Sequence, residues 1–262
     1  MESETDLKLK ELIERGSSTA KNGFKNEQDV VDKFNAWKTD EDAQKWLLVM
    51  GYKLDDIEKV KAIKIAGFHK TDVQVEITIY FKEGTGIENI SIKLVSNSSG
   101  FNQIDKRWVD KYVELWGIPE QITKNLKCFT GETVPLKPSP KDPRRMFIDE
   151  LSEKEQAEMI EFFEKNKILI VADLFKGRDS FPASWLLLYQ KNISVWTLLP
   201  MAMVMNFYGN GPVRITRDGS LRIGRIGMQR KGGDNGRPSA AMLQFKIDPC
   251  EIVKIKQTER GH

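Results

Sequence analysis

Residues 71–95 read TDVQVEITIYFKEGTGIENISIKLV, and this stretch decides the fold. Apolar side chains alternate from Val73 to Phe81, which is the period of a strand with one buried face. A second alternation runs from Ile90 to Leu94, so Ser91 and Lys93 share the opposite face of that strand. The stretch therefore predicts a β-hairpin.

The segments around the hairpin predict helices and a further strand. Gly84 to Gly86 is expected to form the hairpin turn, and Lys61 to Ala66 a preceding strand. The spacing of apolar residues predicts helices over Asn26 to Trp37 and Glu41 to Met50. After the hairpin, Ile104 to Trp116 has the pattern of another helix.

The middle of the chain mixes a loop, a helix and strands. Val134 to Arg145 contains four prolines and is predicted to be a loop. Ser152 begins a capping box, which opens a helix through about Lys165. Ile168 to Ala172 and Trp185 to Tyr189 are short apolar runs that we expect to form buried strands.

Beyond Gly211 the chain has the pattern of strands joined by turns. We expect a strand, a turn at Asp218-Gly219, a second strand from Ser220 to about Arg230, the loop KGGDNGRPS, and an apolar run through Ile247. The pattern as a whole predicts an α/β (α+β) protein, with an N-terminal region that carries the hairpin and a strand-rich C-terminal region.

Composition excludes several classes of protein. The chain has 262 residues, 40% hydrophobic and 30% charged, as expected for a globular protein with a substantial core. It has no apolar run of about 18 residues that would span a membrane, and its N-terminus lacks a secretory signal. Two cysteines and two histidines are too few for a disulfide framework, a zinc site or a histidine triad. We expect a cytoplasmic protein without a membrane partner, whose metal ligands are oxygen atoms.

Positive charge is concentrated near the C-terminus. The net charge of the chain is +3, yet Arg214 to His262 contains 11 Lys and Arg against 5 Asp and Glu. A basic segment is typical of a nucleic-acid surface, but also of an ordinary solvated one. Charge alone leaves both readings open.

Asp72 and Lys93 are the first residues that suggest chemistry. A hairpin of this length brings a carboxylate at the start of one strand near the middle of the other, beside the ammonium of Lys93. A carboxylate there can bind Mg²⁺, and a neighbouring lysine can orient a water that attacks phosphorus. The alternative is a surface ion pair of little consequence.

Glu27 is a candidate for a second carboxylate. The segment GFKNEQDVVDKF predicts a helix whose polar face holds Glu27, while Val30, Val31 and Phe34 are suited to the core. Glu27 can then lie over the hairpin. The alternative is a solvated helix charge.

Two segments have side chains suited to DNA. The first follows the hairpin, and the second is a glycine-rich loop between strands; their candidate contacts are Phe101, Asn102, Gln103 and Lys106, then Gln229, Arg230, Lys231, Asp234, Asn235 and Arg237. Amide and basic side chains hydrogen-bond base edges, and an exposed Phe can wedge between base steps. The alternatives are a core Phe with amides that cap a helix, and a flexible turn.

Four further segments of the chain read SSTAKNGFKNEQDV, IKLVSNSSGFNQIDKRW, RRMFIDELSEKEQ and QRKGGDNGRPSAAMLQFKIDP. These segments resemble the HinP-type restriction endonucleases, which cut DNA at GCGC. In broken form the similarity extends from about Gly16 to Ile255. It implies a compact nuclease of the PD-(D/E)XK superfamily, related to the MspI-like four-base cutters, with a mixed central sheet.

The resemblance also implies roles for individual residues. Asp72 is then a metal ligand, Lys93 the residue that positions water, and the backbone carbonyl of Ile92 a further ligand for Mg²⁺. Ser91 departs from the pattern, because most of the superfamily has Asp or Glu there and the HinP type has Gln. A neutral hydroxyl gives the metal less charge, so the number of metal ions stays open.

On this resemblance, residues 1–150 form the catalytic nuclease region and 151–262 the DNA-recognition region, packed as one compact unit. The implied partners are double-stranded DNA and a cognate DNA methyltransferase in the same cell, and the oligomeric state stays open between monomer and weak dimer. Two other functions remain as hypotheses: a DNA-binding homologue that does not cleave, and a structure-specific repair nuclease.

Overall fold

The computed structural model describes residues 27–65, 74–95, 101–137, 139–178, 181–232 and 237–253. The chain packs as two compact units, residues 1–98 with 177–201 and residues 99–176 with 202–262. The fold therefore divides differently from the regions 1–150 and 151–262 expected from the sequence. The reason is that residues 185–200 return to the sheet of the first unit.

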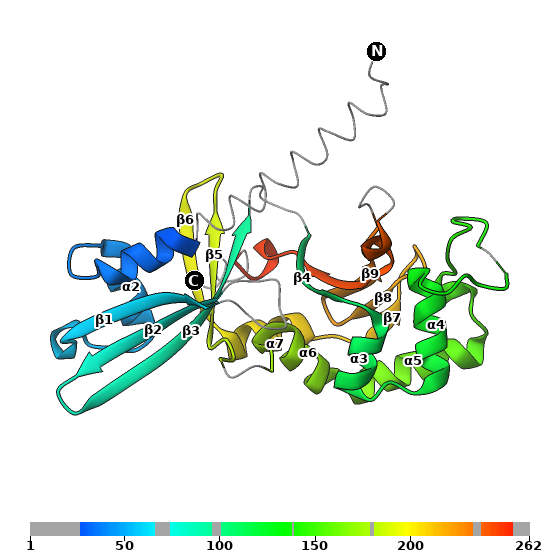
Figure 1. Cartoon of the computed structure of the whole chain (residues 1–262), viewed down its shortest axis with the longest axis horizontal. Helices are drawn as coiled ribbons and strands as arrows, with labels where there is room; N and C mark the ends of the chain where they lie inside the picture. Colours follow the sequence, from blue (N-terminus) through cyan, green and yellow to red (C-terminus); the bar gives the residue numbers. More distant parts are fainter. Residues whose placement is uncertain are drawn as a thin grey trace, which may run out of the picture. The chain divides into compact units, whose positions relative to one another are not determined.

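The first unit is built on a mixed sheet with the strand order β1-β2-β3-β5-β6 (Figure 1). Its strands are β1 (Lys59–Ile65), β2 (Gln74–Phe81), β3 (Gly84–Val95), β5 (Trp185–Gln190) and β6 (Val195–Pro200). β3 and β5 run parallel, and the other neighbours are antiparallel. The mixed central sheet expected from the sequence is confirmed.

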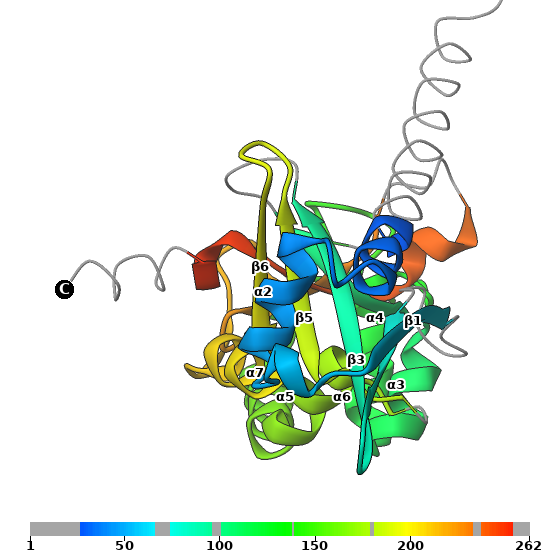
Figure 2. The same cartoon turned by 90° about the vertical axis from the view of Figure 1, so that its left-hand side faces the viewer.

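Helices cover one face of this sheet. Residues 27–35 are helical and α2 (Glu41–Val49) follows, then the short 3-10 helix η1 (Leu54–Asp56). Figure 2 shows α2 lying across β5 and β6. The alternating residues of β2 are fully buried in the core against these helices. The amide side chain of Asn35 donates to the Ala62 carbonyl at 3.2 Å and accepts from the Ala62 N–H at 2.9 Å, which covers the free edge of β1.

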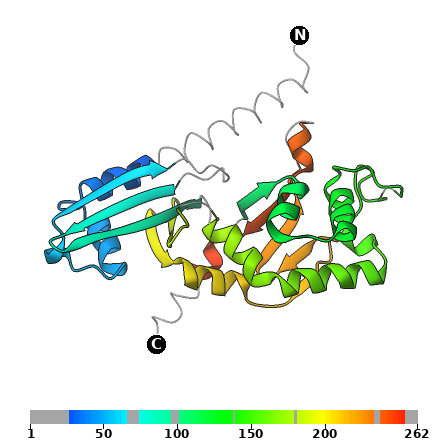
Figure 3. The same ribbon diagram turned by 60° about the horizontal axis from the view of Figure 1, so that its bottom comes forward.

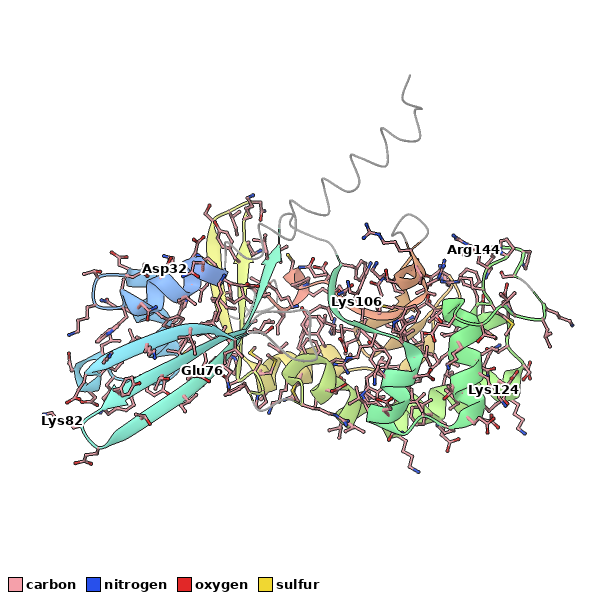
Figure 4. All side chains as sticks on the ribbon, viewed as in Figure 1. Asp32, Glu76, Lys82, Lys106, Lys124 and Arg144 are labelled. Carbon is pink, nitrogen blue, oxygen red and sulfur yellow. The ribbon has the colours of Figure 1, made fainter. Side chains whose placement is uncertain are left out.

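The hairpin turn lies two residues earlier than expected. Phe81 pairs with Gly84, so Lys82 and Glu83 make the turn, and Lys82 is at the tip of the hairpin in Figure 4. Gly86 instead allows an aromatic ring to approach, because a Cβ there would lie 2.8 Å from the Tyr52 hydroxyl.

The second unit contains an antiparallel sheet with the order β4-β10-β9-β8-β7. Its strands are β4 (Asn102–Arg107), β7 (Val213–Ile215), β8 (Leu221–Ile223), β9 (Ile226–Arg230) and β10 (Leu243–Ile247). The strand-rich C-terminal region is thus confirmed.

Helices pack on one face of this second sheet. They are α3 (Val109–Trp116), α4 (Glu120–Thr130), α5 (Glu153–Lys165) and α6 (Lys167–Lys176). The chain also forms α7 (Met201–Gly209) and the 3-10 helices η2 (Ile148–Glu150) and η4 (Pro238–Ala241). Figure 3 shows α5 and α6, in light green, alongside the strands. The Ser152 capping box is present, since its hydroxyl accepts from the Glu155 N–H.

Three expected elements are wrong. Residues 104–107 belong to strand β4, not to a helix, because β10 pairs with them. The run 168–172 is helical in α6, where Ile170, Val171 and Leu174 are buried and Ile168 is 84% exposed, a helical rather than a strand pattern of burial. The stretch 220–230 is two strands, because the chain turns at Gly224. The expected loop over 134–145 is confirmed, apart from Pro138, which is not described.

Candidate functional site

Strand β3 carries Ser91, Ile92 and Lys93 in the middle of the first sheet. Gln74 opposite Ser91 is the last described pair between β2 and β3, and on the other side Lys93 pairs with Leu188 of β5. Asp72 lies outside the described residues, two positions before Gln74 in the chain. The described part of the hairpin therefore shows how β2 and β3 pair, but it does not include the Asp72 carboxylate.

The two faces of β3 differ in their surroundings. Ile90 is fully buried in the helix-covered core, and Ile92 packs against the same core. Because side chains alternate along a strand, Ser91 and Lys93 lie on the opposite face. Ser91 is 8% exposed and Lys93 is half-buried. Their shared face, predicted from the sequence pattern, is confirmed.

Glu27 lies on the helix-covered side of the sheet. Its carboxylate Oε2 is 3.8 Å from Nζ of Lys64 on β1, and its side chain is 14% exposed. Lys64 pairs with Val75, whose side chain belongs to the helix-covered core. Glu27 therefore faces Lys64 of the hairpin sheet from one side, and Lys93 projects from the other.

Around Lys93, the oxygen atoms that β3 itself offers are those of a hydroxyl and of backbone carbonyls. Among the described residues no group of three His, Cys, Asp or Glu side chains converges. The Ser91 hydroxyl and the Ile92 carbonyl are oxygen donors of the kind that Mg²⁺ accepts. Asp72, the carboxylate that the sequence pattern associates with Lys93, lies outside the described residues.

One face of the second sheet is polar and basic, and we term it the polar face. Between β4 and β10, Gln103 pairs with Lys246 and Lys106 with Gln244. Between β10 and β9, Lys246 pairs with Gly227 and Gln244 with Gln229. The pairing continues from Gly227 to Arg222 on β8 and from Arg222 to Arg214 on β7. Directly paired residues share a face. The polar face is thus Gln103, Lys106, Arg214, Arg222, Gly227, Gln229, Gln244 and Lys246. Lys106 is labelled in Figure 4.

A cavity of about 480 Å³ lies on the polar face. It is lined by Phe101, Arg214, Thr216, Asp218, Ser220, Leu221, Arg222, Gly227, Met228, Gln229 and Lys246. Phe101 is 61% exposed at this cavity, so it is not a core residue. Gly227 has no side chain to fill part of the cavity, and a Cβ there would contact only the Lys246 carbonyl oxygen, at 3.8 Å.

Three cations of the cavity have no carboxylate partner within the described ranges: Arg214, Arg222 and Lys246. Burial lowers the pKa of Lys246, since desolvation disfavours its charged form. A phosphate or a base edge would satisfy these groups. None of the three is among the contacts expected from the sequence, although all three lie in the basic segment from Arg214 to His262.

Some expected contact residues lie elsewhere. Arg230 pairs with fully buried Leu243, on the face opposite to Gln229, and its guanidinium is 3.8 Å from Asp142. Asn102 pairs with buried Ile247 and so faces away from the polar face. Alternation along β9 explains the first difference, because adjacent residues point to opposite faces.

The glycine-rich loop is only partly described. Lys231 is half-buried and Arg237 is exposed, whereas Asp234 and Asn235 lie outside the described residues. Gln103, Lys106 and Gln229 are therefore the expected contacts that the structure brings together, with Phe101 at the same cavity.

In the described part of the chain no helix combines the length and apolar character needed to cross a membrane.

Comparison with known proteins places this geometry in a family. A family model described as R.HinP1I restriction endonuclease matches residues 50–253. The solved structure of restriction endonuclease MspI in complex with its cognate DNA is similar in fold, with a TM-score of 0.55 and 16% sequence identity, over 84% of this chain and 87% of that chain. None of the curated proteins matches the sequence significantly. The chain belongs to the R.HinP1I restriction endonuclease family, shares its fold with the MspI structure, and is a type II site-specific DNA nuclease.

Proposed function

We propose that this nuclease hydrolyses phosphodiester bonds of double-stranded DNA at a short palindrome, GCGC, with Mg²⁺ as cofactor. The observation that carries the proposal is the polar face, within a member of a restriction endonuclease family. Its amides and cations complement guanine O6 and N7 and cytosine N4, which a palindrome of G and C presents in the major groove. The cognate DNA of the MspI structure supports a duplex as ligand.

We assign recognition of base edges to Gln103, Lys106 and Gln229. Pairing across β4, β10 and β9 puts their side chains on one face. Arg214, Arg222 and Lys246 supply positive charge beside them that no carboxylate of the described residues neutralises, which suits phosphate oxygens. Phe101, exposed at the cavity, is the side chain that can wedge between base steps.

Catalysis is assigned to the first unit. Asp72 and the Ile92 carbonyl would hold Mg²⁺, which supplies a Lewis acid toward the phosphodiester. Lys93 orients the attacking water, and Ser91 contributes a neutral oxygen. Glu27, the second carboxylate expected from the sequence, contacts Lys64 on the helix-covered side, opposite to the face of Lys93, so we leave it outside the proposed catalytic centre. The sequence positions support the pair, because Asp72 comes two residues before Gln74 and Lys93 two residues after Ser91, and Gln74 and Ser91 are paired in the antiparallel hairpin.

Digestion of a sequenced plasmid tests the proposal. The purified protein should give discrete fragments with Mg²⁺ and none with EDTA, and sequencing of the fragment ends should return GCGC. Discrete fragments with another sequence at their ends would reject the site but retain the enzyme class. Binding without cleavage would indicate a non-cleaving homologue, and cleavage confined to mismatches or branches a repair nuclease.

The cellular partners follow from the same proposal. A host that makes this enzyme needs its own GCGC sites protected, so we propose a cognate DNA methyltransferase in the same cell. Plasmid isolated from that host should resist digestion, and the same plasmid from a host without the methyltransferase should be cut. Sedimentation of the purified protein decides between monomer and weak dimer.

A further inference from the structure

Strand β4 joins the second sheet through a β-bulge. Asp105 pairs with Phe245, but the next pair is Gln103 with Lys246, so Ile104 is an extra residue on β4. Gln103 and Lys106 are three residues apart and would point to opposite faces of a regular strand. The bulge is what places both on the polar face.

The same bulge turns two charged residues inward. Asp105 and Arg107 pair with Phe245 and Leu243, which are fully buried. The Asp105 side chain is 4% exposed and that of Arg107 is 11% exposed. Arg107 directly follows Lys106, a candidate DNA contact. Its side chain nevertheless points into the unit and not toward a ligand on the polar face.

A network of charges holds these inward residues. The Arg107 guanidinium lies 3.1 Å from Asp105 and 3.2 Å from Asp173 of α6, whose side chain is 1% exposed. The indole N–H of Trp116 on α3 donates to the same Asp173 oxygen at 2.9 Å, and the Lys106 N–H donates to Asp105 at 2.9 Å. The network ties an edge strand to two helices.

We propose that Asp105, Arg107 and Asp173 are positioning residues for DNA recognition, because their buried network fixes the bulged register of β4 and with it the placement of Gln103 and Lys106. A slip of one residue would turn Lys106 inward and Arg107 outward. Buried ion networks are often no more stabilising than apolar residues of similar volume, so stability alone does not account for this one. The inference rests on the proposed contact of the polar face with DNA.

The test removes the charges but keeps the shape. In the triple variant Asp105→Asn/Arg107→Met/Asp173→Asn, both acceptors for the Lys106 and Trp116 N–H groups remain. We expect a folded variant with a lower melting temperature, because the new buried amide N–H groups lack acceptors, together with faster hydrogen exchange in residues 102–107 and a fall of about tenfold in the ratio of cognate to random binding. The matched control, Lys111→Ala/Glu114→Ala, removes an exposed 2.8 Å ion pair on α3 and should change none of these.

Gln103→Ala, measured in parallel, separates the two proposals. A normal ratio in Gln103→Ala would reject the polar face as the recognition surface. A reduced ratio in Gln103→Ala with a normal ratio in the folded triple variant would overturn the positioning role alone.

A second variant, with one substitution, tests the inference if the triple variant does not fold. Arg107→Lys keeps the charge, but an ammonium lacks the planar fork that contacts both carboxylates. It should raise exchange in β4 and lower the ratio by a smaller factor, and unchanged exchange with an unchanged ratio would overturn the inference.

Discussion

The position of Lys93 on a central strand determines the face of the sheet from which its side chain projects. Its neighbours Ile90 and Ile92 belong to the helix-covered core, so alternation fixes the face from which Ser91 and Lys93 project. The sequence pattern was sufficient to predict this, because alternation is a local property. It was not sufficient to place Glu27, whose contact with Lys64 depends on how a helix packs on the sheet.

Asp72→Ala and Lys93→Ala should each reduce cleavage about 10²- to 10³-fold or more, because each removes a group that we propose to act on the reacting phosphate. Both should keep specific DNA binding in Ca²⁺, since neither reads a base. Cleavage of a labelled duplex and a binding titration measure the two properties.

Lys82→Ala, at the tip of the same hairpin, is the control and should cut normally. Ser91→Ala should be milder than Asp72→Ala, because water can replace a neutral ligand. Normal cleavage by Lys93→Ala would remove that residue from the catalytic centre.

Gln229 and Arg230 are adjacent but should have opposite effects. Gln229 is on the polar face, so Gln229→Ala should weaken binding to cognate DNA relative to random DNA by about 1 to 3 kcal/mol, at an unchanged free energy of unfolding. Arg230 is 11% exposed and near Asp142 in the interior, so Arg230→Ala should reduce the free energy of unfolding by about 1 to 3 kcal/mol.

Competition binding at fixed salt and urea unfolding separate these effects. A lower binding ratio in Arg230→Ala, with normal stability, would show that Arg230 contacts DNA despite its inward position.

At the scale of elements, the sequence predicted what depends on local pattern and failed where tertiary contacts decide. The hairpin strands and α5 follow from alternation and a capping box. α6 was predicted as a strand because a short apolar run has no distinctive period. β4 was included in a helix because its sequence, NQIDKR, has one apolar residue, and only pairing with β10 makes it a strand.

Gly224 is the residue on which the turn between β8 and β9 depends. Its φ is +57°, and a Cβ there would lie 2.7 Å from the Tyr208 carbonyl oxygen. Gly224→Ala should therefore lower the free energy of unfolding by about 2 to 4 kcal/mol, through backbone strain plus overpacking. Thermal or urea unfolding measures the loss.

Gly117 provides the matched control, because its φ is +66° and nothing lies within 4 Å of the added Cβ. Gly117→Ala should cost only the strain, about 1 to 2 kcal/mol. Equal losses in the two variants would show that the contact at Gly224 relaxes without cost.

At the scale of the molecule, the chain leaves the first unit and returns to it. β3 pairs in parallel with β5, which is about 90 residues later in the sequence, and this pairing brings 185–200 into the first sheet. No local pattern reports such a pairing, so a boundary at residue 150 was the simplest reading of the sequence. The discontinuous division still gives each unit its own sheet and leaves the assignment of catalysis and recognition to separate sheets as a proposal.

The salt dependence of binding tests the polar face as part of the whole molecule. Each phosphate contact releases counterions, so its removal should lower the slope of log K against log salt by about one unit. Arg214→Ala and Lys246→Ala should each have this effect, because among the described residues neither cation pairs with a carboxylate. Gln103→Ala should leave the slope unchanged, since a neutral amide displaces no counterion.

Lys124→Ala on α4 is the control for lost charge, because Lys124 is 63% exposed and pairs with Glu120 away from the second sheet's polar face. Its slope should equal that of the wild type. Binding titrations on one duplex at four salt concentrations give all the slopes. If Arg214→Ala and Lys246→Ala keep the wild-type slope, the cavity does not bind phosphate. Its cations must then serve base edges, where the same variants would lower the ratio of cognate to random binding.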